Sequence, residues 1–108
     1  MLNNLADEIH QNNIEKGWYE SSRTFGDIIS LCHSELSEAL EEHRNGHDAG
    51  YIYYREDGKP EGIAVEMVDT MIRILDWFAS EDIDIDYVMR LKLEFNKTRE
   101  YRHGGKSL

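Results

Sequence analysis

The sequence predicts an all-α domain, and three observations support this expectation. Apolar residues recur at three- and four-residue intervals in four segments of the chain. Two of these segments are followed by glycines typical of helix ends, Gly17 and Gly46. The 108 residues are 40% hydrophobic and 31% charged, as in a single folded domain spanning residues 1–108. Because four such helices enclose only a small core, we expect a four-helix bundle completed by homo-oligomerisation, as a homodimer or homotetramer.

The first two expected helices run from Leu2 to Ile14 and from Phe25 to Arg44. Both segments carry apolar residues at helical spacing. Thr24 stands three residues before Asp27, which is a weak form of the capping box that opens many helices. The second helix is therefore expected to begin directly after Thr24.

Three glutamates of the second helix lie close to its apolar side. At about 100° per residue, Glu35, Glu38 and Glu42 fall inside or at the edge of the apolar stripe, whereas Glu41 points away. An unpaired charge is costly in an apolar setting, so a plain acidic solvent face is the weaker interpretation. The single cysteine, Cys32, lies in the same stripe and is interpreted as a core residue rather than a nucleophile.

Residues 46–60 lack helical periodicity. The run Tyr51-Ile52-Tyr53-Tyr54, followed by Asp57-Gly58, indicates either a short strand and turn or a flexible flap. The next residues, Lys59-Pro60-Glu61-Gly62, are typical of a helix entrance with the only proline near the first turn.

The third expected helix runs from Ile63 to Phe78, with apolar residues almost all round it. A helix of this kind is normally buried. One face nevertheless carries the charged residues Glu66, Asp69, Arg73 and Asp76. Several charges aligned on a buried helix favour a functional site over a structural role.

A fourth helix is expected after an acidic connector at residues 80–86, which offers several N-cap residues. Its apolar residues lie between Val88 and Phe95, and the pattern fades after Arg99. Three polar side chains, Lys92, Asn96 and Arg99, fall on one face of this helix at positions i, i+4 and i+7.

The C-terminal end of the chain is basic. Six of the 12 Lys and Arg residues lie between Arg90 and Lys106. Gly104-Gly105, beside His103 and Lys106, suits a loop that folds its backbone amides around a phosphate. An anion site is one interpretation of this end. A solvated basic helix end followed by a frayed terminus is the other.

Two pairs of carboxylates suggest a metal site. Glu35 and Glu38 have i, i+3 spacing, as do Glu66 and Asp69, so each pair lies on one helix face. Four carboxylates brought together by two packed helices repel one another unless a cation lies between them. Mg²⁺, with Mn²⁺ as a substitute, prefers oxygen ligands and commonly binds together with phosphates. These residues predict a metal-dependent enzyme acting on phosphates.

The overall charge limits the partners. A net charge of −10 argues against general binding of nucleic acid but permits a nucleotide, because a metal bridges carboxylates and phosphates. No apolar run is long enough to span a membrane and no signal peptide is evident, so we expect no membrane interaction and a cytoplasmic setting.

The combined motifs Ser34-Glu35-Leu36-Ser37-Glu38 and Glu66-Met67-Val68-Asp69 resemble those of the MazG-like nucleotide pyrophosphohydrolases, in the all-α NTP pyrophosphatase superfamily. The segments 59–64 and 96–106 resemble a small subgroup, and the likeness covers residues from about Ile9 to Lys106. One position departs from the pattern, since many members carry a second glutamate where this chain has Ser34. The outermost metal contact is then absent or water-mediated, and the number of ions stays open.

The resemblance implies hydrolysis of an NTP or dNTP to the monophosphate and pyrophosphate. The implied Mg²⁺ ligands are Glu35, Glu38, Glu66 and Asp69. Glu38 or Glu42 is the preferred acceptor of a proton from the attacking water. Glu42 is alternatively a substitute ligand or a group that positions water.

The resemblance also implies substrate-binding residues. The residues expected to hold the far phosphates are Lys92, Arg99, His103 and Lys106. Asn96 is expected to contact phosphate or sugar, and Trp18 to stack on the base, with ordinary packing as the alternative for Trp18. Arg73 and Asp76 are expected to orient the site through an ion pair. The histidines, among them His10 and His47, show no ligand spacing.

Three other functions stay open at this point. One is a different substrate within the same superfamily, as in a dUTPase-like or modified-nucleotide hydrolase, because base selectivity depends on pocket shape. Another is a non-catalytic homo-oligomeric interaction module, in which the carboxylates form salt bridges between helices. A di-iron carboxylate bundle is disfavoured because neither acidic motif contains Glu-x-x-His. The basic, Gly-Gly-containing end favours the enzyme.

Overall fold

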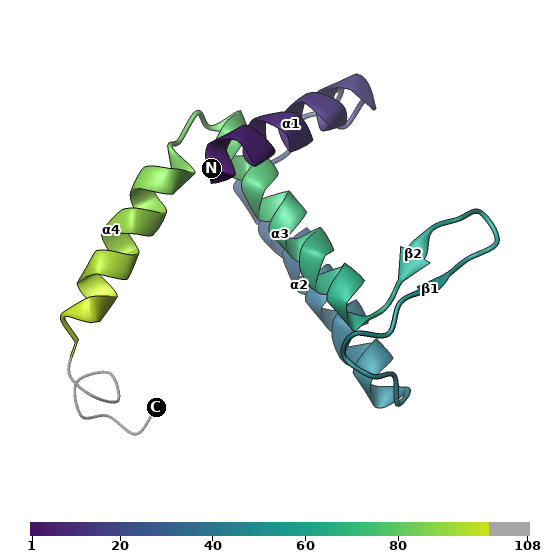
Figure 1. Ribbon diagram of the computed structural model, residues 1–108. Coiled ribbons are helices and arrows are strands. Elements are labelled where there is room, and N and C mark those ends of the chain that lie inside the picture. Colours follow the sequence, from purple (N-terminus) through teal and green to yellow (C-terminus); the bar gives the residue numbers. More distant parts are fainter. Residues whose placement is uncertain (100–108) are drawn as a thin grey trace.

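The computed structural model describes residues 1–99. Its elements are α1 (Leu2–Glu15), α2 (Phe25–Arg44), β1 (Tyr53–Tyr54), β2 (Pro60–Glu61), α3 (Ile63–Ser80) and α4 (Ile85–Lys97). In Figure 1, α2 and α3 lie side by side, α1 packs across one end of α3, and α4 projects away from these helices. The mostly helical fold is as predicted. Within the described residues, no helix has the length and apolar character needed to cross a membrane.

The start of α2 confirms the expected capping box. The Thr24 hydroxyl accepts a hydrogen bond from the Asp27 amide at 3.0 Å, and the Asp27 carboxylate accepts one from the Thr24 amide at 3.0 Å. These contacts satisfy amide groups that the beginning of a helix otherwise leaves without partners. Farther along α2, Cys32 is buried, as predicted.

The segment between α2 and α3 forms a hairpin. β1 and β2 pair antiparallel, with Tyr54 opposite Pro60. The strand-and-turn interpretation of this segment is therefore confirmed. The expectation that Pro60 lies near the first turn of the third helix is wrong, because the helix begins at Ile63. The proline is tolerated because it lies in a two-stranded ribbon with an open edge.

Gly62 is the hinge between the hairpin and α3. Its φ is +140°, and a Cβ atom at this position would lie 2.3 Å from the carbonyl oxygen of Tyr51. Only glycine tolerates both the φ angle and this approach of two backbone segments. Gly62 thereby sets where α3 begins, and Glu66 lies in the first turn of that helix.

The buried core is small. Ala6 of α1, Leu75 of α3 and Ile85 of α4 form its centre. The residues packed around this centre are Leu2, Ile9, Phe78 and Ala79. α2 adds a second buried row, which consists of Ile28, Cys32 and Ala39. Helix packing therefore places α2 and α1 against α3, which is the central helix of the chain.

The expectation that the third helix is buried on all sides is wrong for the single chain. The Met71 side chain is 55% exposed, and other large apolar residues of α2 and α3 are also exposed. We call this set the apolar face; it consists of Phe25, Ile29, Leu36, Leu40, Met67, Met71 and Ile74. An apolar groove between α2 and α3 is lined by Phe25, Ile29 and Ile74. This groove connects the part of the apolar face on α2 with the part on α3.

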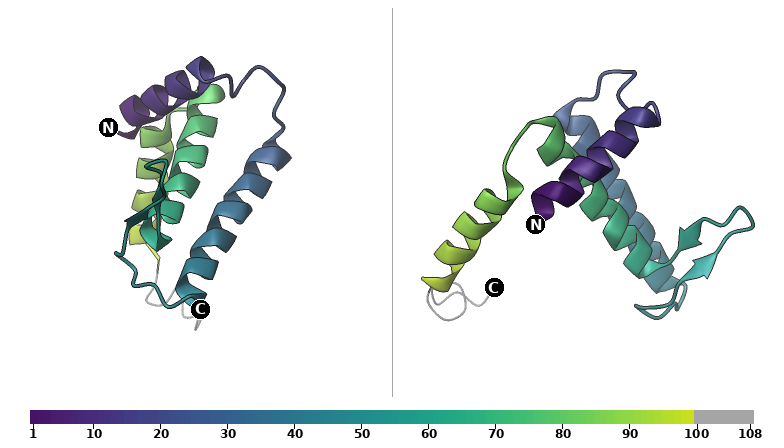
Figure 2. Two further views of the ribbon diagram at one scale, coloured as in Figure 1. Left: turned by 90° about the vertical axis from the view of Figure 1, so that its right-hand side faces the viewer. Right: turned by 45° about the horizontal axis from the view of Figure 1, so that its top comes forward.

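α4 is attached to the rest of the chain at its first turn. The Asp86 carboxylate accepts hydrogen bonds from the amides of Leu2 (2.9 Å) and Asn3 (3.2 Å). In return, the Asn3 side chain accepts a hydrogen bond from the Ile85 amide at 3.0 Å. The N-termini of α1 and α4 therefore cap each other. The rest of α4 does not join the other helices, so one chain alone does not form the expected four-helix bundle (Figure 2).

Candidate functional site

Three of the four predicted acidic ligands meet between α2 and α3. One carboxylate oxygen from each of Glu35, Glu38 and Glu66 lies within 4.8 Å of the other two. We call these three residues the acidic cluster. The i, i+3 spacing on α2 presents Glu35 and Glu38 together, and the first turn of α3 supplies Glu66. The predicted convergence of the two helices is confirmed for this part of the site.

Glu66 is the buried member of the acidic cluster. Its side chain is 3% exposed, and within residues 1–99 its Oε2 atom has no hydrogen-bond partner. Burial raises the pKa of Glu66 to about 9, with further contributions from the neighbouring carboxyl groups of Glu35 and Glu38. A buried polar oxygen without a partner is costly. A cation bound at the acidic cluster would remove this cost.

The pKa of Glu35 is shifted in the opposite direction to that of Glu66. Burial opposes its ionisation, but hydrogen bonds from Arg73 prevail and lower the pKa of Glu35. The Arg73 guanidinium donates to Glu35 Oε1 from Nη2 at 2.8 Å and from Nε at 3.1 Å. The expected ion pair between Arg73 and Asp76 is therefore replaced by a pair between Arg73 and Glu35, which ties α3 to α2.

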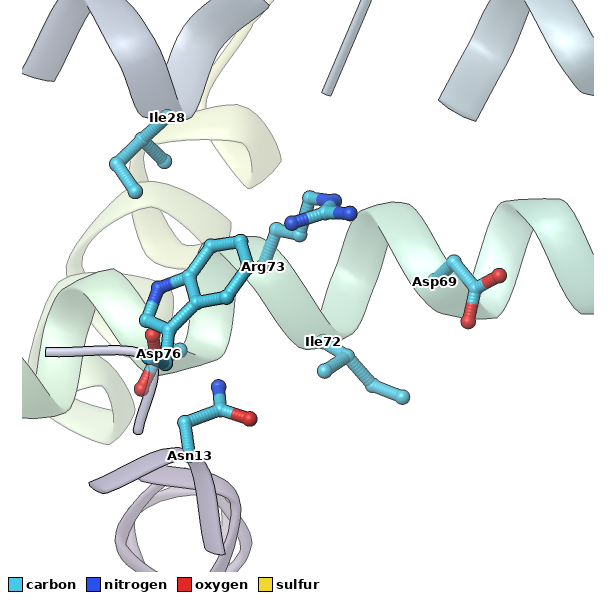
Figure 3. A pocket seen from close by; sticks show the side chains of 7 residues that line it. Asn13, Ile28, Asp69, Ile72, Arg73 and Asp76 are labelled. Atoms are coloured by element: carbon cyan, nitrogen blue, oxygen red, sulfur yellow. The ribbon is translucent and has the colours of Figure 1, made fainter. Parts of the chain in front are cut away.

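Asp69, the fourth predicted ligand, lies beside the acidic cluster. Its carboxylate is not one of the three oxygens that converge. Burial, followed by the nearby charge of Glu35, raises the pKa of Asp69. Asp69 also lines a cavity together with Arg73 (Figure 3), so it lies where the acidic cluster and this cavity adjoin.

The cavity has a volume of about 200 Å³ and lies between α1, α2 and α3 (Figure 3). Its lining residues are Asn13, Trp18, Ile28, Asp69, Ile72, Arg73 and Asp76. We call it the Trp18 cavity. Ile28 and Ile72 supply apolar walls, whereas Asn13 supplies an amide that can donate and accept hydrogen bonds. This mixture of apolar walls and a few polar groups is typical of small-molecule sites.

Trp18 was predicted as a stacking platform, and the structure places it in the lining of this cavity. Its Nε1 atom is buried and has no hydrogen-bond partner within residues 1–99. The Arg23 guanidinium lies 3.7 Å from the centre of the indole ring. Arg23 is exposed, so a planar ligand can displace it from the ring without opening the core.

A buried carboxylate supports the wall of the Trp18 cavity. Asp76 is 2% exposed; its Oδ1 lies 2.9 Å from His10 Nδ1, and its Oδ2 accepts a hydrogen bond from the Tyr19 hydroxyl at 2.5 Å. Burial, together with Asp76, raises the pKa of Tyr19 to about 12. The sequence interpretation missed His10 and Tyr19. Both contacts join residues more than fifty positions apart, which spacing along one helix does not detect.

Glu42 belongs to a different group of side chains. Its Oε1 atom accepts a hydrogen bond from the Tyr53 hydroxyl at 2.6 Å, and its Oε2 atom pairs with His47. The hydrogen bond from Tyr53 is the main cause of a lowered pKa of Glu42. These contacts attach α2 to the hairpin, and Glu42 is not part of the acidic cluster. Of the two predicted proton acceptors, only Glu38 lies in the cluster.

Among residues 1–99, the predicted phosphate-binding residues are not brought to the acidic cluster by their own chain. Lys92, Asn96 and Arg99 are exposed, on or just after the helix α4 that projects away from α2 and α3 (Figure 1). His103 and Lys106 lie outside the described residues. Within one chain, the candidate site therefore consists of the acidic cluster, Asp69 and the Trp18 cavity.

The chain was also compared with known proteins. No family model matches it, and neither a curated protein nor a solved structure matches it.

Proposed function

We propose that this protein is a Mg²⁺-dependent nucleoside triphosphate pyrophosphohydrolase, which converts an NTP or dNTP to its monophosphate and pyrophosphate. The observation that carries the proposal is the acidic cluster with its buried Glu66 oxygen. The resemblance of the two carboxylate motifs to those of the MazG-like enzymes agrees with this function. The adjoining Trp18 cavity provides room beside the cluster for part of a nucleotide.

The donor set fits a hard divalent cation. Glu35, Glu38 and Glu66 offer carboxylate oxygens, the ligand type that Mg²⁺ and Mn²⁺ prefer, and Asp69 adjoins them. The proton that the raised pKa retains on Glu66 in the metal-free protein is displaced when a cation binds. A bound Mg²⁺ supplies charge neutralisation for phosphate oxygens and lowers the pKa of water.

The remaining groups of the site act through position and proton transfer. Arg73 holds Glu35 in place through two hydrogen bonds, which keeps that carboxylate ionised and directed at the cluster. Glu38 is the exposed member of the acidic cluster and is the group that accepts a proton from the attacking water. Glu42 instead keeps the hairpin against α2.

The Trp18 cavity receives the nucleoside. Ile28 and Ile72 contact the flat faces of a base, and Asn13 and Trp18 Nε1 offer hydrogen bonds to its edge. Asp69 lies where the cavity adjoins the acidic cluster, so a base in the cavity directs its phosphate chain toward the carboxylates and their metal.

The active form is proposed to be a homodimer or homotetramer. The apolar face exposes seven large apolar side chains, and pairing it with the same face of a second copy would bury it between four helices. Such an isologous contact is the commonest route to a closed dimer.

A non-catalytic interaction module is the competing function, and the exposed apolar face is the observation that favours it. The apolar face alone would serve such a role. The module leaves the buried, unpartnered oxygen of Glu66 and the adjoining cavity without a purpose. A homo-oligomeric enzyme accounts for all three features, because pairing of two copies covers the apolar face and catalysis uses the acidic cluster and the cavity.

An assay of products separates these functions. The protein is incubated with each NTP and dNTP and Mg²⁺, and the products are identified by ³¹P NMR. Monophosphate with pyrophosphate is expected. Glu38→Gln should abolish turnover while the helical circular dichroism is retained, and Glu41→Gln, whose exposed carboxylate is not part of the acidic cluster, serves as the matched control. Diphosphate with phosphate would indicate another phosphohydrolase, and absence of turnover on every nucleotide would favour the module.

A further inference from the structure

We propose that Asp76, together with His10 and Tyr19, holds the Trp18 cavity in the arrangement that binds a nucleoside. We call these three side chains the Asp76 network. They are positioning residues, which act on the ligand through the wall of the cavity, and none of them belongs to the acidic cluster. The inference rests on the proposed function, because it names the residues that determine how well the cavity accepts its ligand.

The first argument is that one segment of the chain engages both carboxylate oxygens of Asp76. This residue lies on α3 and is 2% exposed. Its Oδ1 atom lies 2.9 Å from Nδ1 of His10 on α1, and its Oδ2 atom accepts the 2.5 Å hydrogen bond from the Tyr19 hydroxyl. The rings of His10 and Tyr19 also contact each other edge-on, with 4.9 Å between their centres. Because a buried carboxylate is costly unless such partners satisfy it, the three side chains form one unit.

The second argument is the position of the two partners in the sequence. His10 lies three residues before Asn13 on α1, so both side chains lie on the same face of this helix. Tyr19 directly follows Trp18 in the turn after α1. The main chain also joins the two lining residues, because the Trp18 amide donates a hydrogen bond to the Asn13 carbonyl at 2.9 Å. The two contacts of Asp76 therefore attach to α3 the segment that supplies Asn13 and Trp18 to the cavity.

The third argument is the way in which the Trp18 side chain is held. Its Nε1 atom is buried and has no hydrogen-bond partner within residues 1–99. Among the side-chain hydrogen bonds of that part of the chain, the two to Asp76 are the ones that join α1 and the following turn to α3. The direction of the indole ring consequently depends on its neighbour Tyr19 and on packing. A ligand then meets a ring that is already oriented, and such preorganisation lowers the entropy cost of binding.

The Tyr19 hydroxyl remains a donor at neutral and mildly alkaline pH. Burial, followed by the hydrogen bond to Asp76, raises the pKa of Tyr19 to about 12. The phenol therefore keeps the proton that it donates to the carboxylate. The contact that fixes the turn after α1 is consequently present under the conditions in which nucleotide hydrolysis is assayed.

Tyr19→Phe tests the proposal with the smallest change, because it removes one hydroxyl and keeps the ring that contacts His10. With the nucleotide that the wild type hydrolyses best, KM should rise about tenfold, as for the loss of one hydrogen bond to a charged group. The value of kcat should change by less than about twofold, because the acidic cluster is intact. An unchanged KM, or a loss confined to kcat, would overturn the proposal.

A conservative substitution at His10 separates position from mere packing. His10→Ala removes the contact with Asp76 Oδ1 and should also raise KM. His10→Asn offers an amide N–H in place of the imidazole Nδ1, so it should restore part of the lost affinity. A KM that is equally high in both variants would contradict a role for this hydrogen bond.

Tyr53→Phe is the matched control. Tyr53 also donates a hydrogen bond to a carboxylate, at 2.6 Å to Glu42, and its pKa is likewise raised to about 12. That bond attaches the hairpin to α2 and involves no lining residue of the Trp18 cavity. Urea denaturation should detect a loss of stability in both variants, but only Tyr19→Phe should raise KM. An equal rise in both would mean that general loosening weakens substrate binding, and the proposal would fail.

Two measurements test the Asp76 network without relying on catalysis. In ¹H–¹⁵N NMR spectra, Tyr19→Phe should shift the indole N–H signal of Trp18 considerably more than that of Trp77, which contacts Phe25 and Phe78. Calorimetric titration with the nucleoside monophosphates should give an affinity about tenfold lower for Tyr19→Phe than for the wild type.

The two measurements also distinguish the network from the enzyme. A shifted Trp18 signal in a protein that binds no nucleotide would support the network as the holder of the indole ring and reject the nucleoside site. Equal nucleotide binding by the wild type and Tyr19→Phe, with an unmoved Trp18 signal, would keep the enzyme and reject the network.

Discussion

Arg73 on α3 donates two hydrogen bonds to a single carboxylate oxygen of Glu35 on α2. This pair joins the two helices beside the acidic cluster and lowers the pKa of Glu35. The adjacent Glu66, with burial as the dominant cause, has its pKa raised to about 9. The pKa values of these two neighbouring carboxyl groups are thus shifted in opposite directions. Such divergent pKa shifts are common in catalytic sites.

Removal of the Arg73 guanidinium should destabilise the protein. Arg73→Gln leaves the half-buried Glu35 carboxylate without its donor, and the free energy of unfolding should fall by about 1–3 kcal/mol. Urea denaturation followed by circular dichroism measures this loss. Arg90→Gln is the matched control, because Arg90 forms an exposed pair with Glu94 that should contribute less than about 1 kcal/mol. Equal losses in the two variants would show that the Arg73 pair is not a tie between helices.

Metal binding should release protons near neutral pH. The pKa of Glu66 is raised to about 9, so this carboxyl group is mostly protonated at pH 7 in the metal-free protein, and a cation has to displace its proton. Titration calorimetry with Mg²⁺ in two buffers of different ionisation enthalpy should therefore detect release of up to one proton per site. Binding enthalpies that are identical in both buffers would contradict a role for Glu66 as a ligand.

The same pKa shift sets the direction of a pH effect on stability. A carboxyl group whose pKa is higher in the folded state than in the unfolded state binds more protons when folded between these two values. The stability of the metal-free protein should therefore fall as pH rises from about 5 to about 9, the folded pKa of Glu66. Thermal melts across this range, with and without Mg²⁺, measure the effect. Glu66→Gln should flatten the profile and remove the stabilisation by Mg²⁺.

Gly62 should tolerate no side chain. In Gly62→Ala the new Cβ atom would overlap the carbonyl oxygen of Tyr51, in addition to straining a backbone with φ of +140°. Gly58→Ala isolates the backbone cost, because Gly58 also has a positive φ but has no atom within 4 Å of a built Cβ. The free energy of unfolding should fall by about 1–2 kcal/mol in the control Gly58→Ala and by considerably more in Gly62→Ala, as measured by urea denaturation. A milder effect at Gly62 would mean that the hairpin moves freely against α3.

The attachment of α4 should weaken in acid. Hydrogen bonds from the Met1 ammonium and from the Leu2 and Asn3 amides lower the pKa of Asp86. Asp86 therefore contributes stability above the unfolded pKa, and this contribution is lost as pH falls through the lower folded pKa. The melting temperature of Asp86→Asn should lie below that of the wild type at neutral pH, and the two should converge in acid. A difference that persists in acid would show that Asp86 acts through packing alone.

Much of the fold follows from periodicity. The capping residues Thr24 and Asp27 and the helical spacing of apolar residues correctly place α2, because these signals are local. Pro60 was misplaced because Lys-Pro-Glu-Gly suits both a helix entrance and a strand, and pairing with Tyr54 decides between them. The exposure of α3 was missed because an apolar pattern predicts that a helix side is shielded from water. It does not identify the element, or the second copy, that shields it.

The candidate site was predictable where its residues share a helix face. Spacing along α2 and α3 identified Glu35, Glu38 and Glu66, and the packing of these two helices brings them together. Spacing did not identify the contact between Arg73 and Glu35, or that between His10 and Asp76, since each joins two different helices. Glu42 lies on the same side of α2 as Glu35. However, its carboxylate accepts a hydrogen bond from Tyr53 of the hairpin and so does not join the acidic cluster.

Electron paramagnetic resonance with Mn²⁺ tests the central claim most directly, because free Mn²⁺ gives a strong signal that binding removes. The wild-type protein should remove at least one Mn²⁺ per chain from the free pool, Mg²⁺ should restore the signal by competition, and Glu66→Gln should bind much more weakly. An undiminished signal with the wild type, or equal binding by Glu66→Gln, would contradict the proposal that the acidic cluster holds a divalent ion.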